Sequence, residues 1–140
     1  MYISTVLKLP KSSKVYVVGM SGLEHELATE GISHLGGSSP SDNTLEPFDL
    51  SKFEKDASVK VVLCGLDTSI NYTKLSKAFR YLLDEDVVFL ATNMDLTYPS
   101  TGGILPGAGS LTNVLIQSTK RIPTSIGKPE KAMLDCIKAK

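Results

Sequence analysis

Residues 87–95 constrain the fold of this chain more than any other stretch of its sequence. An apolar run begins at Val87, between acidic residues 84–86 and a segment rich in Pro and Gly at 99–103. Such a run predicts a short strand buried on both faces of a sheet. Polar residues, Asn93 and Asp95, follow where this strand should end. Because open α/β sheets bind ligands beyond the carboxyl ends of their strands, residues 93–109 are the first candidate for a functional site.

Apolar runs alternate with helical patterns along the whole chain. We expect further strands at residues 14–19, 32–35, 59–65 and 122–127. Helices are expected after three cap candidates, namely Ser21 in a capping box with Glu24, Ser69 or Asn71, and Ser110. A last helix should start near Pro129. This order predicts an α/β fold, a mainly parallel sheet with flanking helices.

Two of the predicted helices carry an apolar stripe, and one linking segment carries none. The stripes consist of Leu75, Ala78, Phe79 and Leu82 in the first helix, and Leu111, Val114 and Leu115 in the second. The first has i, i+3, i+4, i+7 spacing, which is typical of a helix packed on a sheet by one face. Residues 36–56 are rich in Gly, Ser, Pro, Asp and Asn without periodicity, which predicts an exposed excursion.

Composition excludes several classes of protein. The chain has 140 residues, 15 basic and 15 acidic, so charge gives no reason to expect nucleic-acid or anionic-membrane partners. No apolar run reaches the roughly 18 residues of a membrane span. Cys64 and Cys136 each lie in an apolar segment, which predicts buried free thiols in a reducing, cytoplasmic compartment, with a disulfide between them as the alternative.

Local motifs for metal or nucleotide binding are weak. His25 and His34 have no Cys or carboxylate at ligand spacing, so we expect no metal site there. Glycine-rich nucleotide-binding motifs and the nucleophile elbow are absent from the sequence. Residues 107–110, Gly-Ala-Gly-Ser, leave two interpretations open: a turn with a helix cap, or backbone N–H groups that bind an anion.

Residues 93–97, Asn-Met-Asp-Leu-Thr, resemble the nucleophile motif of haloacid dehalogenase-type phosphatases, with Asn at the nucleophile position. An amide is a poor nucleophile, so the wider context decides the interpretation. Four segments resemble the p-nitrophenylphosphatase, phosphoglycolate phosphatase and NagD-like branch of that superfamily, most closely the fungal p-nitrophenylphosphatases. They are residues 14–27, 65–72, 91–110 and 126–129.

The resemblance implies that most of the chain is the mobile cap inserted in the catalytic core. Residues 14–118 would form this α/β cap, residues 1–13 a core or linker remnant, and residues 119–140 a piece of core with the catalytic Lys128. Substrate-binding residues would lie on the cap. They are Asn93, Asp95, Thr97, Tyr98, Gly107 and Gly109.

The resemblance also implies that two catalytic motifs of the family are missing from the matching segments. The family's nucleophilic Asp-x-Asp motif after a core strand, and its acidic Mg²⁺ motif, have no counterpart in the four matching segments. We therefore expect a fragment, inactive alone, of a Mg²⁺-dependent hydrolase of small phosphorylated substrates, with no metal bound by this chain. The alternative is a non-catalytic α/β binding or dimerisation module. The resemblance implies this alternative because relatives associate through their caps, and it leaves a homodimer through the cap open.

Overall fold

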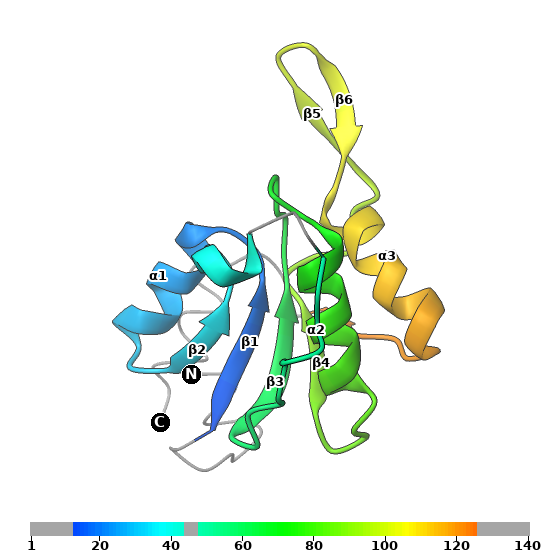
Figure 1. Ribbon diagram of the computed structural model, residues 1–140. Helices are drawn as coiled ribbons and strands as arrows, with labels where there is room; N and C mark the ends of the chain where they lie inside the picture. Colours follow the sequence, from blue (N-terminus) through cyan, green and yellow to red (C-terminus); the bar gives the residue numbers. More distant parts are fainter. Residues whose placement is uncertain (1–12, 44–47, 126–140) are drawn as a thin grey trace.

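Parallel strands form the centre of the molecule. A computed structural model describes residues 13–43 and 48–125. The sheet has the order β2-β1-β3-β4-β7, and all its described pairs are parallel (Figure 1). Its strands are β1 (Lys14–Val18), β2 (Ser33–Gly36), β3 (Val59–Cys64), β4 (Val88–Ala91) and β7 (Thr124–Ser125). The predicted fold class, a mainly parallel α/β sheet with flanking helices, is confirmed.

Side chains of the central strands alternate between two apolar layers, which explains the continuous apolar runs in the sequence. Val15 and Val17 of β1 pack with the helix α1 (Ser21–Thr29), whereas Tyr16 and Val18 pack on the opposite face. That opposite face is covered by α2 (Tyr72–Leu82) and α3 (Ala108–Thr119). A strand buried on both faces needs an apolar residue at every position, not at every second one.

The helix α2 follows its predicted pattern closely. Its start is capped by Asn71, whose side-chain oxygen accepts a hydrogen bond of 2.9 Å from the backbone N–H of Lys74. All four residues of its predicted stripe belong to one apolar cluster or pack against it. At the other end, Arg121 donates to the carbonyls of Leu82 (2.8 Å) and Val87 (2.6 Å), which places a cation where the helix dipole favours one.

Two predicted caps are wrong, and one apolar residue of the predicted second stripe is exposed. The cap of α1 is Met20, and the Glu24 carboxylate does not reach back to Ser21 but accepts from the N–H (3.0 Å) and the hydroxyl (2.6 Å) of Ser38. The cap of α3 is Gly107, three residues before Ser110. Val114 is 49% exposed because α3 buries another stripe, which includes Thr112 and Leu115.

The excursion at residues 36–56 is anchored to the domain through a buried carboxylate, among other contacts. Its short 3-10 helix η2 (Pro40–Asp42) ends at Asp42, whose side chain is buried. The carboxylate accepts from the Tyr16 hydroxyl at 2.7 Å and forms an ion pair with Lys77. Burial, together with this carboxylate, raises the pKa of Tyr16 far above its ordinary value. The expected exposed segment is therefore fixed over the β1–α2 face by a charged contact.

An antiparallel hairpin was not predicted. Its strands β5 (Thr97–Ser100) and β6 (Gly103–Pro106) project away from the sheet between β4 and α3 (Figure 1). The predicted division of the chain at residues 13 and 118 stays a prediction. The predicted last helix near Pro129 and the predicted buried thiol of Cys136 lie outside the described part.

Candidate functional site

Loops after β1, β3 and β4 meet at the carboxyl edge of the sheet. Backbone hydrogen bonds join them: the N–H of Gly65 donates to Val18 O (2.8 Å), and that of Thr92 donates to Cys64 O (2.9 Å). The chain runs from β1 to β2 on one side, and then to β3 on the other side of β1. Such a reversal of strand order leaves a crevice at the carboxyl edge, where open α/β sheets bind ligands.

Asn93 and Asp95 lie in the loop after β4, as the sequence predicts. The side-chain oxygen of Asn93 accepts a hydrogen bond of 3.0 Å from the backbone N–H of Asp95. This contact makes a tight turn, so Asn93 has a structural task that explains an amide at this position. The Asp95 side chain is exposed at the start of the segment that leads into the hairpin.

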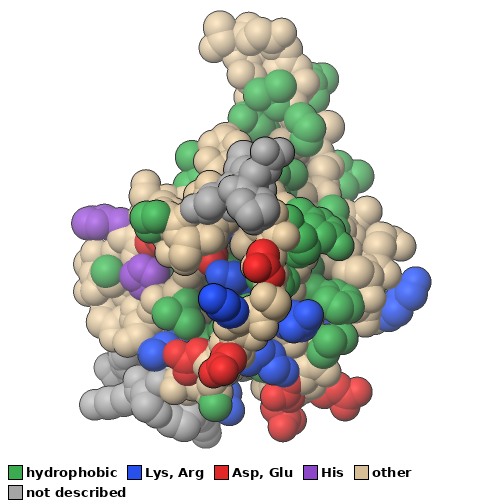
Figure 2. All heavy atoms as spheres, in the orientation of Figure 1, with side chains coloured by type: hydrophobic (Ala, Val, Ile, Leu, Met, Phe, Trp, Pro, Cys, Tyr) green, Lys and Arg blue, Asp and Glu red, His purple; other side chains and the backbone are tan. Residues whose placement is uncertain are grey.

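Thr97 and Tyr98 lie on β5, the first strand of the projecting hairpin. Thr97 is exposed and Tyr98 is half-buried. Apolar side chains also lie along this hairpin (Figure 2), with Ile104 75% exposed. The hairpin therefore offers a mixed polar and apolar surface beyond the carboxyl edge of the sheet.

Gly107 and Gly109 hold the base of the hairpin against the loop after β4. Their backbone N–H groups donate to Leu96 O and Asp95 O, both at 2.8 Å. The Ser110 hydroxyl also donates to Leu96 O at 2.6 Å. Because these two amides are already engaged, the structure favours the turn over the anion-binding loop among the two interpretations of residues 107–110. Neither glycine has room for a Cβ atom, which would collide with the carbonyls of Met94 or Asp95.

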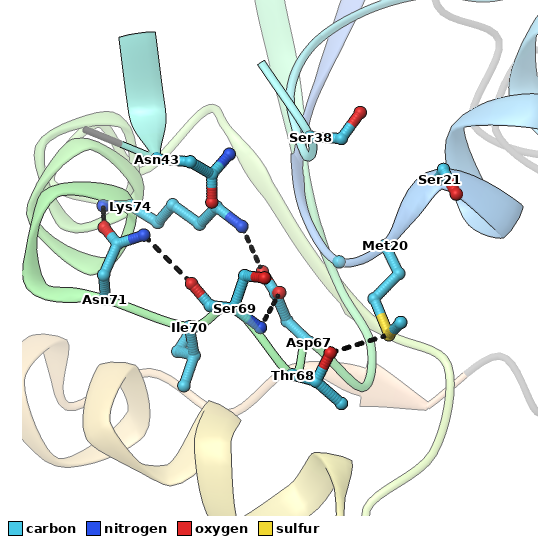
Figure 3. Close-up of a pocket in the computed structure, with 11 residues that line it drawn as sticks. Met20, Ser21, Ser38, Asn43, Asp67, Thr68, Ser69, Ile70, Asn71 and Lys74 are labelled. Carbon is cyan, nitrogen blue, oxygen red and sulfur yellow. Dashed lines mark hydrogen bonds and ion pairs between the residues drawn. The ribbon is translucent and has the colours of Figure 1, made fainter. Parts of the chain in front are cut away.

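A cavity of about 540 Å³ opens at the crevice between the ends of β1 and β3 (Figure 3). Sequence reasoning did not find its central feature, the ion pair of Asp67 and Lys74. The two side chains are each 1% exposed and 2.7 Å apart. The second carboxylate oxygen of Asp67 accepts from the N–H of Ser69 at 2.9 Å. A signal was present, because Lys74 lies three residues after the Asn71 cap on the first turn of α2, close to the loop of Asp67.

No group of three or more His, Cys, Asp or Glu side chains that could hold a metal ion occurs in the described ranges 13–43 and 48–125. An Asp-x-Asp pair is present at Asp84 and Asp86, but it precedes β4 and so lies at the opposite, amino edge of the sheet. The described residues therefore do not fit a Mg²⁺ site. The predicted catalytic Lys128 lies outside the described part. No described helix is long and apolar enough to cross a membrane.

Comparison with curated proteins finds phosphatases over nearly the whole chain. The chain is 45% identical over 137 residues to 4-nitrophenylphosphatase of Schizosaccharomyces pombe, which covers 97% of this chain and 46% of that protein. It is 37% identical to phosphoglycolate phosphatase 2 of Arabidopsis thaliana, over 94% of this chain and 44% of that protein. The chain thus spans slightly less than half the length of these relatives. No protein-family model matches.

Solved structures agree with the sequence comparison. A p-nitrophenyl phosphatase from Archaeoglobus fulgidus matches with a TM-score of 0.68 and 25% identity, over 99% of this chain and 46% of that chain. A putative p-nitrophenyl phosphatase from Bacillus subtilis matches with a TM-score of 0.67 and 29% identity, over 95% of this chain and 44% of that chain. A glycerol phosphate phosphatase from Mycobacterium tuberculosis, in complex with magnesium, has the same fold. Its TM-score is 0.69 and its identity 23%, over 98% of this chain and 37% of that chain.

Fold and carboxyl-edge loops define an α/β domain of the haloacid dehalogenase class of phosphatases. Sequence identity narrows this class. The homologues of the chain belong to the branch that contains the p-nitrophenylphosphatases and the phosphoglycolate phosphatases, as its resemblance to them predicts.

Proposed function

We propose that this chain is the substrate-specificity cap of a phosphate-monoester hydrolase of the p-nitrophenylphosphatase and phosphoglycolate phosphatase type. The observation that carries the proposal is the 45% identity to 4-nitrophenylphosphatase over 97% of the chain. Residues 14–118 would be the cap, and residues 1–13 and 119–140 would belong to the catalytic core. The substrate would be a small phosphate ester.

The hairpin and the turn before it would contact the leaving group of that ester. Asn93 orients the turn, Asp95 and Thr97 offer exposed polar groups, and Tyr98 offers an aromatic face. Gly107 and Gly109 would contribute by permitting the close approach of the two loop ends. A cap that closes over the ester excludes water, and exclusion of water strengthens the electrostatic contacts to the phosphate.

Catalytic chemistry would be supplied by groups outside the described residues. Lys128 is the candidate to stabilise charge on the phosphate, as the resemblance implies. A relative of the same fold is known in complex with magnesium, and we propose Mg²⁺ for the complete enzyme. The described residues gather no set of metal ligands, so the cap would not hold this ion. The buried free thiol of Cys64 is consistent with a reducing, cytoplasmic location.

A chimera tests the proposal. Replace the matching part of S. pombe 4-nitrophenylphosphatase by this chain, and measure hydrolysis of p-nitrophenyl phosphate and of phosphoglycolate with Mg²⁺. The chimera should hydrolyse both esters. The ratio of their kcat/KM values should differ from that of the S. pombe enzyme by about tenfold, equivalent to about 1.4 kcal/mol in the transition state.

The 140-residue chain alone is the matched control, and it should show no turnover. Mg²⁺-dependent activity of the isolated chain that disappears in Asp95→Ala would show that residues 93–97 are an active site rather than a cap loop. A folded chimera without activity toward either ester would contradict the role of the chain as a phosphatase cap.

A second candidate function, dimerisation through the cap, rests on one surface. An apolar groove of about 410 Å³ lies between α2 and α3, lined by side chains that include Phe48, Tyr72, Phe79 and Val114. Phe48 and Tyr72 are 47% and 70% exposed, although their rings are in tilted contact, with centroids 4.8 Å apart. Sedimentation at rising concentration tests this function, and Val114→Glu should shift a dimer to monomer.

A further inference from the structure

The cavity between the ends of β1 and β3 has the size and the polar lining of a small-molecule site. Its lining comes from the loop before α1, the segment around η2, and the loop before α2 (Figure 3). A volume of about 540 Å³ lies within the range of small-molecule sites. The residues that line it do not include those of the hairpin, so this site is separate from the proposed ester-binding surface.

Charge in the cavity is balanced. Lys74 is the only described cation that lines it, and its ammonium lies 2.7 Å from the carboxylate of Asp67. A buried pair of this kind presents no net charge to a ligand, which disfavours a phosphate or a carboxylate. The ammonium has three N–H donors and a single hydrogen-bond partner among the described residues. It therefore keeps donors for a neutral oxygen.

Asn43 supplies the complementary group. Its side-chain N–H₂ donates to Gly37 O at 3.1 Å and to Ser39 O at 2.8 Å, and these two bonds fix which way the amide points. The other amide atom, Oδ1, is buried and has no hydrogen-bond partner within the described ranges. Asn43 and Lys74 both line the cavity (Figure 3). A spare acceptor and spare donors thus belong to one cavity.

A hydroxyl group satisfies both atoms, because it accepts from an ammonium and donates to an amide oxygen. The rest of the lining has the same character: the hydroxyls of Ser21 and Thr68 lie at its edge, with the apolar side chains of Met20 and Ile70. A lining that combines hydroxyl and apolar groups suits a molecule with hydroxyls on a hydrocarbon skeleton.

We propose that this cavity binds a small uncharged polyol, a sugar or a sugar alcohol, with one hydroxyl bridging Lys74 Nζ and Asn43 Oδ1. The site does not depend on phosphatase activity. It lies on the same edge of the sheet as the hairpin, so an occupied cavity would also stabilise the loops at that edge.

Titration of the ¹⁵N-labelled chain with sorbitol, glucose and inorganic phosphate tests this site. Sorbitol or glucose should produce saturable shifts of the backbone amides of residues 19–21 and 68–71. Inorganic phosphate should produce none there. No saturable shift with either polyol would overturn the proposal, as would a preference of these amides for phosphate.

Two variants and one control locate the binding. Asn43→Ala removes the bridging acceptor, and Thr68→Val removes a hydroxyl at nearly constant shape. Asn43→Ala should weaken polyol binding about tenfold or more, and Thr68→Val should weaken it by a smaller factor. The control is Asn113→Ala, an exposed amide on α3, which should bind as the unmodified chain does. Unchanged affinity in both cavity variants would overturn the proposal, even if one of them folded poorly.

Discussion

Asp67 and Lys74 show how a single pair of residues can hold the crevice together. Removing two charges from water is costly, and the pair is tolerated because each side chain has partners. Asp67 accepts from both Lys74 and the backbone of Ser69, and Lys74 lies in the first turn of α2. The pair therefore ties the loop after β3 to the first turn of the helix that follows it.

Lys74→Met should lower the free energy of unfolding by about 3–5 kcal/mol, because it leaves a buried, uncompensated carboxylate. Urea unfolding followed by circular dichroism measures this loss. The double variant Asp67→Asn/Lys74→Met, which removes both charges, should recover most of it. Lys52→Met, at an exposed position, should change stability by less than about 0.5 kcal/mol. A Lys74→Met protein as stable as the Lys52→Met control would show that the pair is not structurally important.

Cys64 should make stability depend on pH in the alkaline range. Burial raises the pKa of its thiol from 9.0 to about 12, against a smaller lowering by a hydrogen bond with Thr112. Between pH 9 and 12 the unfolded chain releases this proton while the folded chain keeps it, so stability falls as pH rises. In a Cys136→Ser background, the fall from pH 8 to 11 should exceed that of Cys64→Ala by about 3 kcal/mol. Parallel pH profiles for the two proteins would contradict a raised pKa.

At the scale of elements, the hairpin depends on its base. A two-stranded sheet is marginally stable by itself in water, and most side chains of β5 and β6 are exposed. Prolines occur in both strands, which is compatible with strands that each have an unpaired edge. The contacts of Gly107, Gly109 and Ser110 to the loop after β4 must therefore position the hairpin.

Gly109→Ala should disturb this base, because the added methyl group would meet the carbonyl of Met94. We expect a loss of about 1–3 kcal/mol on thermal unfolding, and amide shifts spread over residues 93–107. Gly102→Ala is the matched control, since a Cβ atom there meets nothing within 4 Å. Equal stability of the two variants would show that the close approach is not what fixes the loop.

At the scale of the whole molecule, the structure has a rigid sheet and a projecting arm. The apolar clusters on the two faces share β1, β3 and β4, and each cluster includes side chains of these strands that are almost fully buried. The hairpin has no such layer on either side among the described residues. Stability should therefore be uneven, with the sheet as the last part to open.

Hydrogen exchange of the isolated chain should show this difference. Amides of Val61–Leu63 should exchange at the rate of global unfolding, and those of β5 and β6 should exchange much faster. The chain should be folded at least over residues 14–118, because two apolar layers are present without any partner. Protection of the hairpin equal to that of β3 would indicate that its strands are covered, for example by a second copy of the chain.

The sequence by itself determined the elements whose signals lie within a few neighbouring residues. The apolar runs predicted β1, β3 and β4, and the Asn71 cap with a stripe of period 3.6 predicted α2, since each signal lies within a few neighbouring residues. The same reasoning placed Asn93 and Asp95 at the carboxyl edge, because a parallel strand order sends every strand end to one side.

Tertiary structure decided what depends on residues far apart in sequence. Glu24 contacts Ser38 in place of Ser21, and Asp42 is buried because Tyr16 and Lys77 meet it from other elements. The Asp67–Lys74 pair and the Asn43 amide line one cavity only after β1 and β3 become neighbours. From sequence alone, a charged or polar residue is expected to be exposed. Its burial requires hydrogen-bonding partners, and only folding brings those from distant segments within hydrogen-bond distance.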